Sequence, residues 1–168
     1  MEDFSRMVDV KSAIELGEGQ FIEFKEAADK NLAREMVAFA NSSGGFIYLG
    51  ITDTCNIKGV ETSNKLKSQI QDTARNCDPP LAILLLQQEN VLIIEVKEGV
   101  SKPYSCASGF YMRMGANSQK MSRDEILSLA IKTGKIRYDE QICAQFDWRD
   151  FDEEKFEYYL KLARISNN

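Results

Sequence analysis

Two β-type stretches separated by a helical stretch constrain the fold of this chain most. Residues 21–25 alternate in polarity, which predicts a strand with Phe21, Glu23 and Lys25 on one face. Residues 46–51 are apolar and rich in β-favouring side chains, which predicts a buried strand. Between them, residues 30–41 have apolar side chains at helical spacing and end in Asn-Ser-Ser-Gly-Gly, a helix stop. The core is therefore expected to begin with a strand, a helix and a strand.

The other segments continue this mixture of helices and strands. Helices are predicted at 9–16, 63–76, 122–132 and 152–163. Strands are predicted at 81–87 and 91–96, which form a hairpin, and at 102–105 and 110–114. The pattern predicts an α+β fold with a mixed β-sheet packed against helices.

Length and composition indicate one globular domain with an appendage. The chain has 168 residues and 43% hydrophobic side chains. We expect residues 1–137 to form the domain and residues 138–168 to form an acidic helical tail. The beginning of the sequence does not resemble a signal peptide, and its longest apolar run, 81–86, is too short to cross a bilayer. We therefore expect a cytoplasmic protein without a membrane partner.

Cysteine and histidine usage excludes several kinds of site. The sequence has no histidine, which excludes histidine-based catalytic triads and histidine metal ligands. Its four cysteines, Cys55, Cys77, Cys106 and Cys143, are widely spaced. This spacing favours reduced thiols over a zinc site. An ATP site is also not supported, because no Gly-x-x-x-x-Gly-Lys-Ser/Thr run occurs.

A basic segment lies inside an acidic chain. The net charge is −5, yet residues 97–137 have eight basic and three acidic side chains, a local +5. Such a block predicts either a phosphate-binding face or an ordinary solvated surface. Seven residues are candidates for binding DNA or RNA, the cations through phosphates and the tyrosines through base stacking: Lys97, Lys102, Tyr104, Tyr111, Arg113, Lys120 and Arg123. Arg113 has a structural ion pair as its alternative role.

Three carboxylates near the ends of the first two strands suggest a metal site. Glu18, Glu23 and Asp53 could together hold Mg²⁺ or Mn²⁺, with Lys25 neutralising a phosphate oxygen. This hypothesis requires the two strands to be antiparallel neighbours, because parallel pairing would place Glu18 and Asp53 at opposite ends. The alternative is a surface turn at Glu18, an ion pair at Glu23 and an Asx turn at Asp53.

Two further features have alternative interpretations. Gly44-Gly45 could cradle a phosphate, or it could end a helix and form a tight turn. The helix after Asp152 has an apolar stripe that includes Phe156, Tyr159 and Leu160. That stripe could pack on its own domain, on a second copy in a homodimer, or on a following domain.

Three motifs in series resemble the Schlafen-type Alba-like (AlbA) domain, formerly called the divergent AAA domain. They are Glu18…Glu23-Phe-Lys25, Ala38-Phe-Ala-Asn41…Gly44-Gly45…Leu49-Gly50-Ile51…Asp53, and Phe110-Tyr-Met-Arg113-Met-Gly115…Ser118. The resemblance covers roughly residues 10–135. It implies a mixed α/β fold, nucleic-acid binding, and a place before a winged-helix region in bacterial transcription regulators.

The resemblance also implies an alternative, enzymatic role. In Schlafen proteins the matching carboxylates form a metal-dependent endoribonuclease site, and Glu18, Glu23 and Asp53 fall on those positions. The Cys/His zinc site of Schlafen proteins has no counterpart here. Their paired lobes are also missing, so one lobe would need a second chain to form the same groove. Our expectation is a nucleic-acid-binding regulator domain that is not an enzyme. A nuclease and a dimerisation module are the alternatives.

Overall fold

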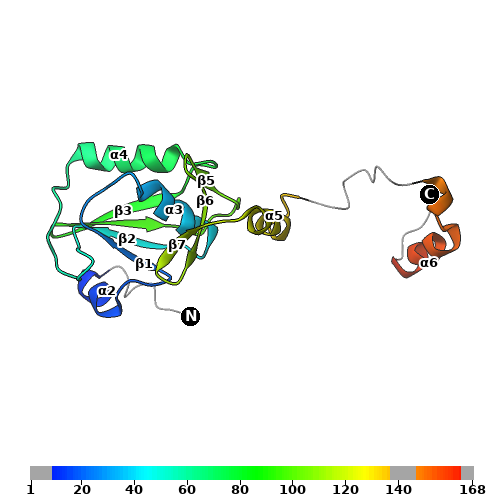
Figure 1. Ribbon diagram of the computed structural model, residues 1–168, viewed down its shortest axis with the longest axis horizontal. Coiled ribbons are helices and arrows are strands. Elements are labelled where there is room, and N and C mark those ends of the chain that lie inside the picture. The colour runs from blue at the N-terminus through cyan, green and yellow to red at the C-terminus, as the bar shows by residue number, and fades with distance from the viewer. Residues whose placement is uncertain (1–8, 137–146, 164–168) are drawn as a thin grey trace. The chain divides into compact units, whose positions relative to one another are not determined.

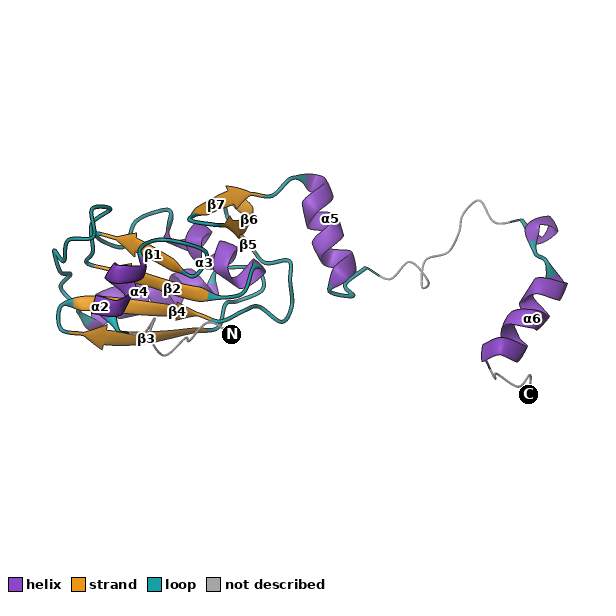
Figure 2. Ribbon diagram, turned by 90° about the horizontal axis from the view of Figure 1, so that it is seen from below, coloured by secondary structure: helices purple, strands orange, loops and turns teal. Residues whose placement is uncertain are grey.

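A four-stranded mixed sheet forms the centre of residues 9–136, which the computed structural model describes together with residues 147–163. Its strands are β1 (Ile22–Lys25), β2 (Gly45–Leu49), β3 (Ile83–Gln88) and β4 (Val91–Val96), in the order β1-β2-β4-β3 (Figures 1 and 2). β1 and β2 pair in parallel, and the other two pairs are antiparallel. The predicted α+β class with a mixed sheet is confirmed.

Helices cover both faces of this sheet. α3 (Leu32–Asn41) and α4 (Asn64–Arg75) cover one face, where Met36, Phe39 and Ile70 are buried against Ile47 and Ile94. The short helix α2 (Val10–Leu16) packs its buried Val10 and Ala13 on the other face. Asp9 caps α2 by accepting from Ser12 N, and Ser63 caps α4 by accepting from Leu66 N, so the sequence-based helix starts are confirmed.

The turn between α3 and β2 needs two glycines because the helix end lies against the sheet. Gly44 has φ +76°, and a Cβ there would lie 2.7 Å from Val96 O. A Cβ on Gly45 would lie 2.4 Å from the Phe39 ring. Close packing and the left-handed backbone therefore account for both glycines without a bound phosphate.

A second, small sheet follows the large one. It contains β5 (Ser105–Cys106), β6 (Gly109–Met114) and β7 (Asn117–Lys120), all antiparallel. The Asn41 side chain joins it to α3: its amide donates to Tyr104 O and Tyr111 O and accepts from Tyr104 N. Of the predicted strand at 102–105, Ser105 alone lies in a strand, β5, which continues to Cys106. The sequence pattern missed β7 because 117–120 is wholly polar.

The helix α5 (Arg123–Lys132) ends the first unit. Ser122 and Glu125 form a capping box at the start of this predicted helix: Ser122 Oγ accepts from Glu125 N, and the Glu125 carboxylate accepts from Ser122 N. Thr133 Oγ1 donates to Lys102 O at 2.8 Å and so attaches the end of α5 to the loop before β5.

The chain divides into two units, Met1–Ile136 and Arg137–Asn168. The described part of the second unit holds a 3-10 turn, η2 (Trp148–Asp150), and α6 (Glu153–Ala163). Asp152 accepts from Lys155 N, so the helix starts where the sequence predicts, and the Phe151 and Phe156 rings on either side of this start are 5.3 Å apart. Residues 138–146 of the predicted tail, with Cys143, lie outside the described residues.

Among residues 9–136 and 147–163, no helix combines the length and hydropathy needed to cross a membrane. Cys55, Cys77 and Cys106 are free thiols. Cys77 is buried in the main core, which raises the pKa of its thiol to about 11.

Candidate functional site

An open hollow of about 620 Å³ brings the predicted site residues together. Glu18, Glu23, Lys25 and Asp53 all line it, along with Asp29 and Asn117. Lys25 and Asp29 form a loose ion pair with 3.7 Å between Nζ and Oδ2. The hollow is therefore strongly acidic, with one half-buried lysine among its carboxylates.

The pairing of the first two strands contradicts the condition that the metal hypothesis set. β1 and β2 run parallel, with Ile22 opposite Phe46 and Lys25 opposite Leu49, where the metal hypothesis required antiparallel strands. Glu18 still reaches the hollow because the chain before β1 turns back along the strand. Gly19 N donates to Ile22 O at 3.0 Å, and Glu18 Oε1 accepts from Phe24 N at 2.9 Å.

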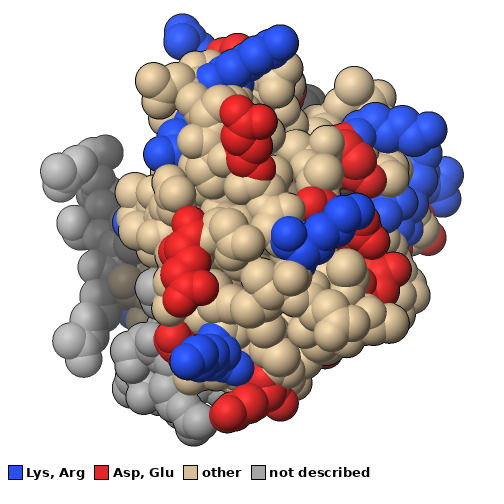
Figure 3. All heavy atoms as spheres, turned by 90° about the vertical axis from the view of Figure 1, so that its left-hand side faces the viewer, with Lys and Arg blue, Asp and Glu red and all other residues tan. Residues whose placement is uncertain are grey.

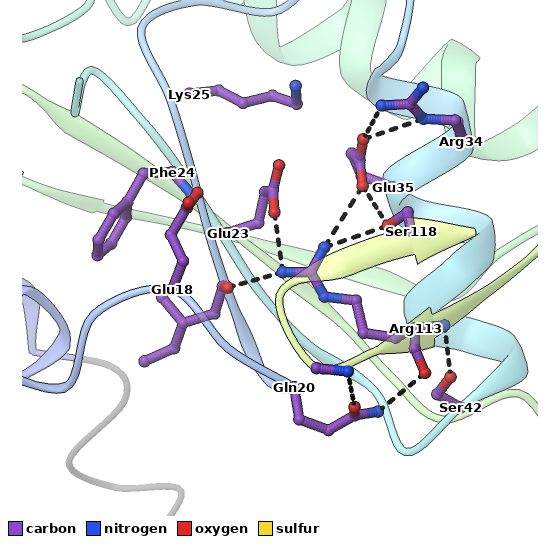
Figure 4. A network of polar contacts seen from close by, with 12 residues as sticks. Glu18, Gln20, Glu23, Phe24, Lys25, Arg34, Glu35, Ser42, Arg113 and Ser118 are labelled. Atoms are coloured by element: carbon purple, nitrogen blue, oxygen red, sulfur yellow. Dashed lines mark hydrogen bonds and ion pairs between the residues drawn. The ribbon is translucent and has the colours of Figure 1, made fainter. Parts of the chain in front are cut away.

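A buried arginine forms the wall beside Glu23 (Figure 4). The Arg113 side chain has no exposed surface, and its Nη2 lies 2.8 Å from Glu23 Oε2. Arg113 also donates to Gly19 O and Ile22 O, both at 2.9 Å from Nη2. Its guanidinium carbon lies 4.7 Å from the centre of the Phe39 ring. The guanidinium therefore ties β6 to the edge of β1.

A second carboxylate completes this network. Glu35 on α3 is 2% exposed, accepts from Arg34 Nη2 at 2.7 Å, and has Arg113 Nη1 3.6 Å away. Ser118 on β7 donates to Glu35 and accepts from Arg113 Nη1. Two arginines and two glutamates balance each other here, as a buried network requires.

The environment of Glu23 disfavours its charged form. Burial raises the pKa of Glu23 above its usual 4.5, the nearby Glu35 charge raises it further, and Arg113 partly offsets both. The Glu18 charge makes a smaller contribution to the raised pKa of Glu23. Protonation of Glu23 is therefore easier in the folded protein than in the unfolded chain.

The sequence interpretation missed Glu35, although one signal was available. Glu35 lies three residues after Leu32 and four before Phe39, on the same helical stripe that was predicted to be buried. A carboxylate on a buried stripe needs a cationic partner. Gln20 was also missed: it accepts from Gly115 N and donates to Arg113 O, which holds the β6–β7 turn over the β1 loop (Figure 4).

The carboxylates of the hollow do not form a ready metal site. No three His, Cys, Asp or Glu side chains converge at metal-binding distance in the described part of the chain. One carboxylate oxygen of Glu18 accepts a hydrogen bond from Phe24 N, and one of Glu23 forms the ion pair with Arg113. The oxygen donors suit a hard cation in kind, but this arrangement does not fit one.

The seven predicted nucleic-acid contacts separate into buried and exposed groups. Arg113 is 3% exposed and Tyr104 is 6% exposed, so the expectation that they contact phosphate or base is corrected. Their polar atoms are used internally, since Tyr104 Oη accepts from Ser101 N. For Arg113, the structural alternative is the one observed.

The other five of these residues retain some exposure. Tyr111 is half-buried beneath the Arg34 guanidinium, 5.9 Å from its ring centre. Lys102 is 12% exposed and pairs with Glu98 at 2.7 Å. Lys97, Lys120 and Arg123 are exposed. On the face drawn in Figure 3, by contrast, acidic and basic side chains are interspersed.

Comparison with known proteins identifies the class to which this fold and site belong. The family model for Schlafen, AlbA_2 matches residues 18–122, from the first carboxylate to the cap of α5. The chain belongs to this family, as its three motifs predicted. The family indicates a nucleic-acid-related function. None of the curated proteins compared matches the chain.

A solved structure supports the fold. The DIP2311 protein from Corynebacterium diphtheriae is similar with a TM-score of 0.50 and 20% sequence identity. The match covers 66% of this chain but 24% of that one, so this chain spans about a quarter of that protein's length. At such an identity the likeness extends to the fold alone.

Proposed function

We propose that this chain contains the nucleic-acid-binding domain of a bacterial transcription regulator. The observation that supports it most is the exposure of Lys97, Lys120 and Arg123 in the +5 segment, while Arg113 is neutralised inside the domain. Exposed lysine and arginine side chains contact phosphates through long-range attraction and short hydrogen bonds. Binding by such contacts depends little on base sequence.

The proposed binding face includes β7 and the beginning of α5. Lys120 is the last residue of β7, and Arg123 is the first residue of α5. The Arg123 side chain is 85% exposed and, among the residues that the structure describes, forms an ion pair with the neighbouring, similarly exposed Asp124 alone, 3.0 Å away. Exchanging that weak surface pair for a phosphate costs little. The acidic hollow would repel the phosphate backbone of the nucleic acid, and this repulsion would orient the nucleic acid on the domain.

Charge reversal with a matched control tests this proposal. Lys120→Glu with Arg123→Glu should weaken binding to a DNA or RNA duplex and reduce the salt slope of log K by about 1.8, since each phosphate contact on B-DNA contributes about 0.9. Lys11→Glu with Lys65→Glu is the control, because both lysines are exposed in the first turns of other helices. Equal slopes in wild type and both variants would contradict the proposal.

A metal-dependent endoribonuclease is a second candidate, although its carboxylates would have to move closer together to hold an ion, and one observation favours it. Glu18, Glu23, Asp53 and Lys25 line a single hollow. The test is RNA and DNA cleavage with Mn²⁺ or Mg²⁺, with and without EDTA. Asp53→Asn should abolish cleavage, and Glu26→Gln should not, although Glu26 also lines the hollow. Absence of metal-dependent cleavage by the wild type would exclude this candidate.

A protein-interaction role rests on the second unit. Phe156 and Tyr159 on α6 are 44% and 58% exposed, while Leu160 is buried. Because of this exposed apolar surface, dimerisation through α6 stays an alternative function. The homodimer remains a prediction, and so does the cytoplasmic location. So does the winged-helix region proposed to follow the acidic tail.

A further inference from the structure

The two edges of the central sheet differ in chemistry. β1 is one edge and β3 is the other, and Figure 2 shows β3 as the outermost strand on its side. β3 reads Ile-Leu-Leu-Leu-Gln-Gln, without a charge or a proline. Natural edge strands are usually protected by charges, prolines or covering segments, because their free backbone groups would otherwise pair with another strand.

The β1 edge is closed by its own chain. The outward Phe24 N–H donates to the Glu18 carboxylate at 2.9 Å. The outward Ile22 C=O accepts from Gly19 N and from Arg113 Nη2. Glu23 and Lys25 add charges to the same strand. These contacts use two outward backbone groups of β1 and make this edge less open to a further strand.

The backbone of β3 has outward groups that β4 does not use. Lys97 N donates to Ala82 O, which fixes the alternation of hydrogen-bonded pairs in the β3–β4 ladder. Leu84, Leu86 and Gln88 consequently bond to β4. Ile83, Leu85 and Gln87 point their N–H and C=O groups away from it, on a side where the described sheet has no other strand.

The side chains of β3 are apolar where they are exposed. Leu84 is 47% exposed and Leu86 is 36% exposed, and both lie on the face opposite α3 and α4. Ile83 and Leu85 lie on the other face, packed against the main core. Two leucines and a row of backbone groups without a strand partner in the described part of the chain thus lie along one edge.

We propose that β3 pairs antiparallel with β3 of a second copy of this chain, around a two-fold axis at Leu85. Leu85 would face the partner's Leu85, and Ile83 would face the partner's Gln87. Each outward N–H of one chain would then meet an outward C=O of the other. The sheet continues across the axis into its symmetry mate, as an isologous contact requires.

The side chains fit this register as well as the backbone does. Leu84 lies opposite the partner's Leu86 in a non-hydrogen-bonded pair, the closer of the two pair types, and the two-fold axis repeats this contact. No charged residue in Ile83–Gln88 opposes a like charge across the axis. The edge is therefore complementary to itself, which favours a second copy over a foreign peptide. This interface does not depend on nucleic-acid binding.

Sedimentation of the full chain tests the proposal. The wild type should sediment at twice the 19.1 kDa of one chain. Leu84→Lys with Leu86→Lys should sediment as the monomer over the same concentrations, because like charges would meet across the axis. Leu127→Lys is the matched control, since Leu127 on α5 is 45% exposed, and it should stay dimeric. Thermal unfolding of each variant checks that it is folded.

Amide hydrogen exchange gives a second readout at single residues. In the dimer, the amides of Ile83, Leu85 and Gln87 should be protected, and dilution to the monomer should remove their protection first. The amides of Leu84 and Leu86 bond to β4 and should stay protected in both states. A monomeric wild type would overturn the proposal, as would a dimer that persists in the double lysine variant.

Discussion

Replacing Arg113 by methionine tests whether the buried network holds the domain together. Methionine has a similar length and could remain against the Phe39 ring, so the change removes the charge and the donors with little loss of volume. It leaves Glu23 and Glu35 without their shared cation. It also leaves Gly19 O without its guanidinium donors.

The expected loss is large compared with the stability of a domain. Removing one partner of a buried ion pair costs about 3–5 kcal/mol, and the whole free energy of unfolding is typically about 5–15 kcal/mol. For a chain of this size, such a loss lowers the melting temperature by roughly 6–20 °C.

Urea unfolding of the wild type, Arg113→Met and Arg123→Met would measure this loss. Arg123 is the control because its side chain is 85% exposed, and its replacement should change the free energy of unfolding by about 0.5 kcal/mol or less. If Arg113→Met costs less than about 1 kcal/mol, the argument that the network stabilises the fold is refuted.

The pH dependence of that loss gives an independent check. The pKa of Glu23 is already raised by burial, and losing Arg113 removes the main group that lowers it. A carboxyl with a raised folded pKa costs stability as pH rises from its unfolded value of 4.5 through the folded pKa, since the folded state then holds more protons than the unfolded state. The deficit of Arg113→Met should therefore be larger at pH 7 than at pH 5.

Three other changes have expected outcomes that the same methods check. Tyr48→Phe should leave the free energy of unfolding unchanged or raise it by up to about 1 kcal/mol, because within the described residues the buried Tyr48 hydroxyl has no hydrogen-bond partner; a clear loss of stability in calorimetry would contradict this. Asn41→Ala should cost about 2–4 kcal/mol, because it removes the partner of the buried Tyr104 N–H and C=O and of the partly buried Tyr111 C=O, whereas exposed Asn56→Ala should cost little. Cys77 should resist alkylation at about pH 8 in the folded protein and react in guanidinium, since burial raises the pKa of its thiol to about 11; peptide mass spectrometry measures this, and fast labelling of the folded form would refute it.

The sequence predicted the local elements of the fold well, because capping residues and apolar periodicity act within a few residues. The Ser122–Glu125 capping box and the Asp9 cap begin two of the predicted helices. β7 could not be predicted from its pattern: Asn117–Lys120 has no apolar side chain, and the strand forms because β6 supplies its hydrogen-bond partners. Tertiary context overrides weak local preference in such strands.

The candidate site was predicted only in part, because its contacts join residues that lie far apart in the sequence. Glu18, Glu23, Lys25 and Asp53 were expected together and do line one hollow. β1 and β2 pair in parallel, yet Glu18 reaches the hollow because a turn held by its hydrogen bond with Phe24 N brings it alongside β1, which the sequence pattern does not reveal. The burial of Arg113 followed from α3 packing on β6, which alternation within β6 alone does not reveal.

The Arg113 network has a consequence for folding kinetics. Arg113 bonds to Gly19 and Ile22, which precede it by 94 and 91 residues. Closing so long a loop is slow and entropically costly, so these contacts are expected to form after the local hairpins and helices. Contacts that form after the transition state change the unfolding rate and leave the folding rate nearly constant. In a chevron plot, Arg113→Met should therefore raise the unfolding rate and leave the folding rate nearly unchanged. The network would then determine how long the folded domain persists before it unfolds.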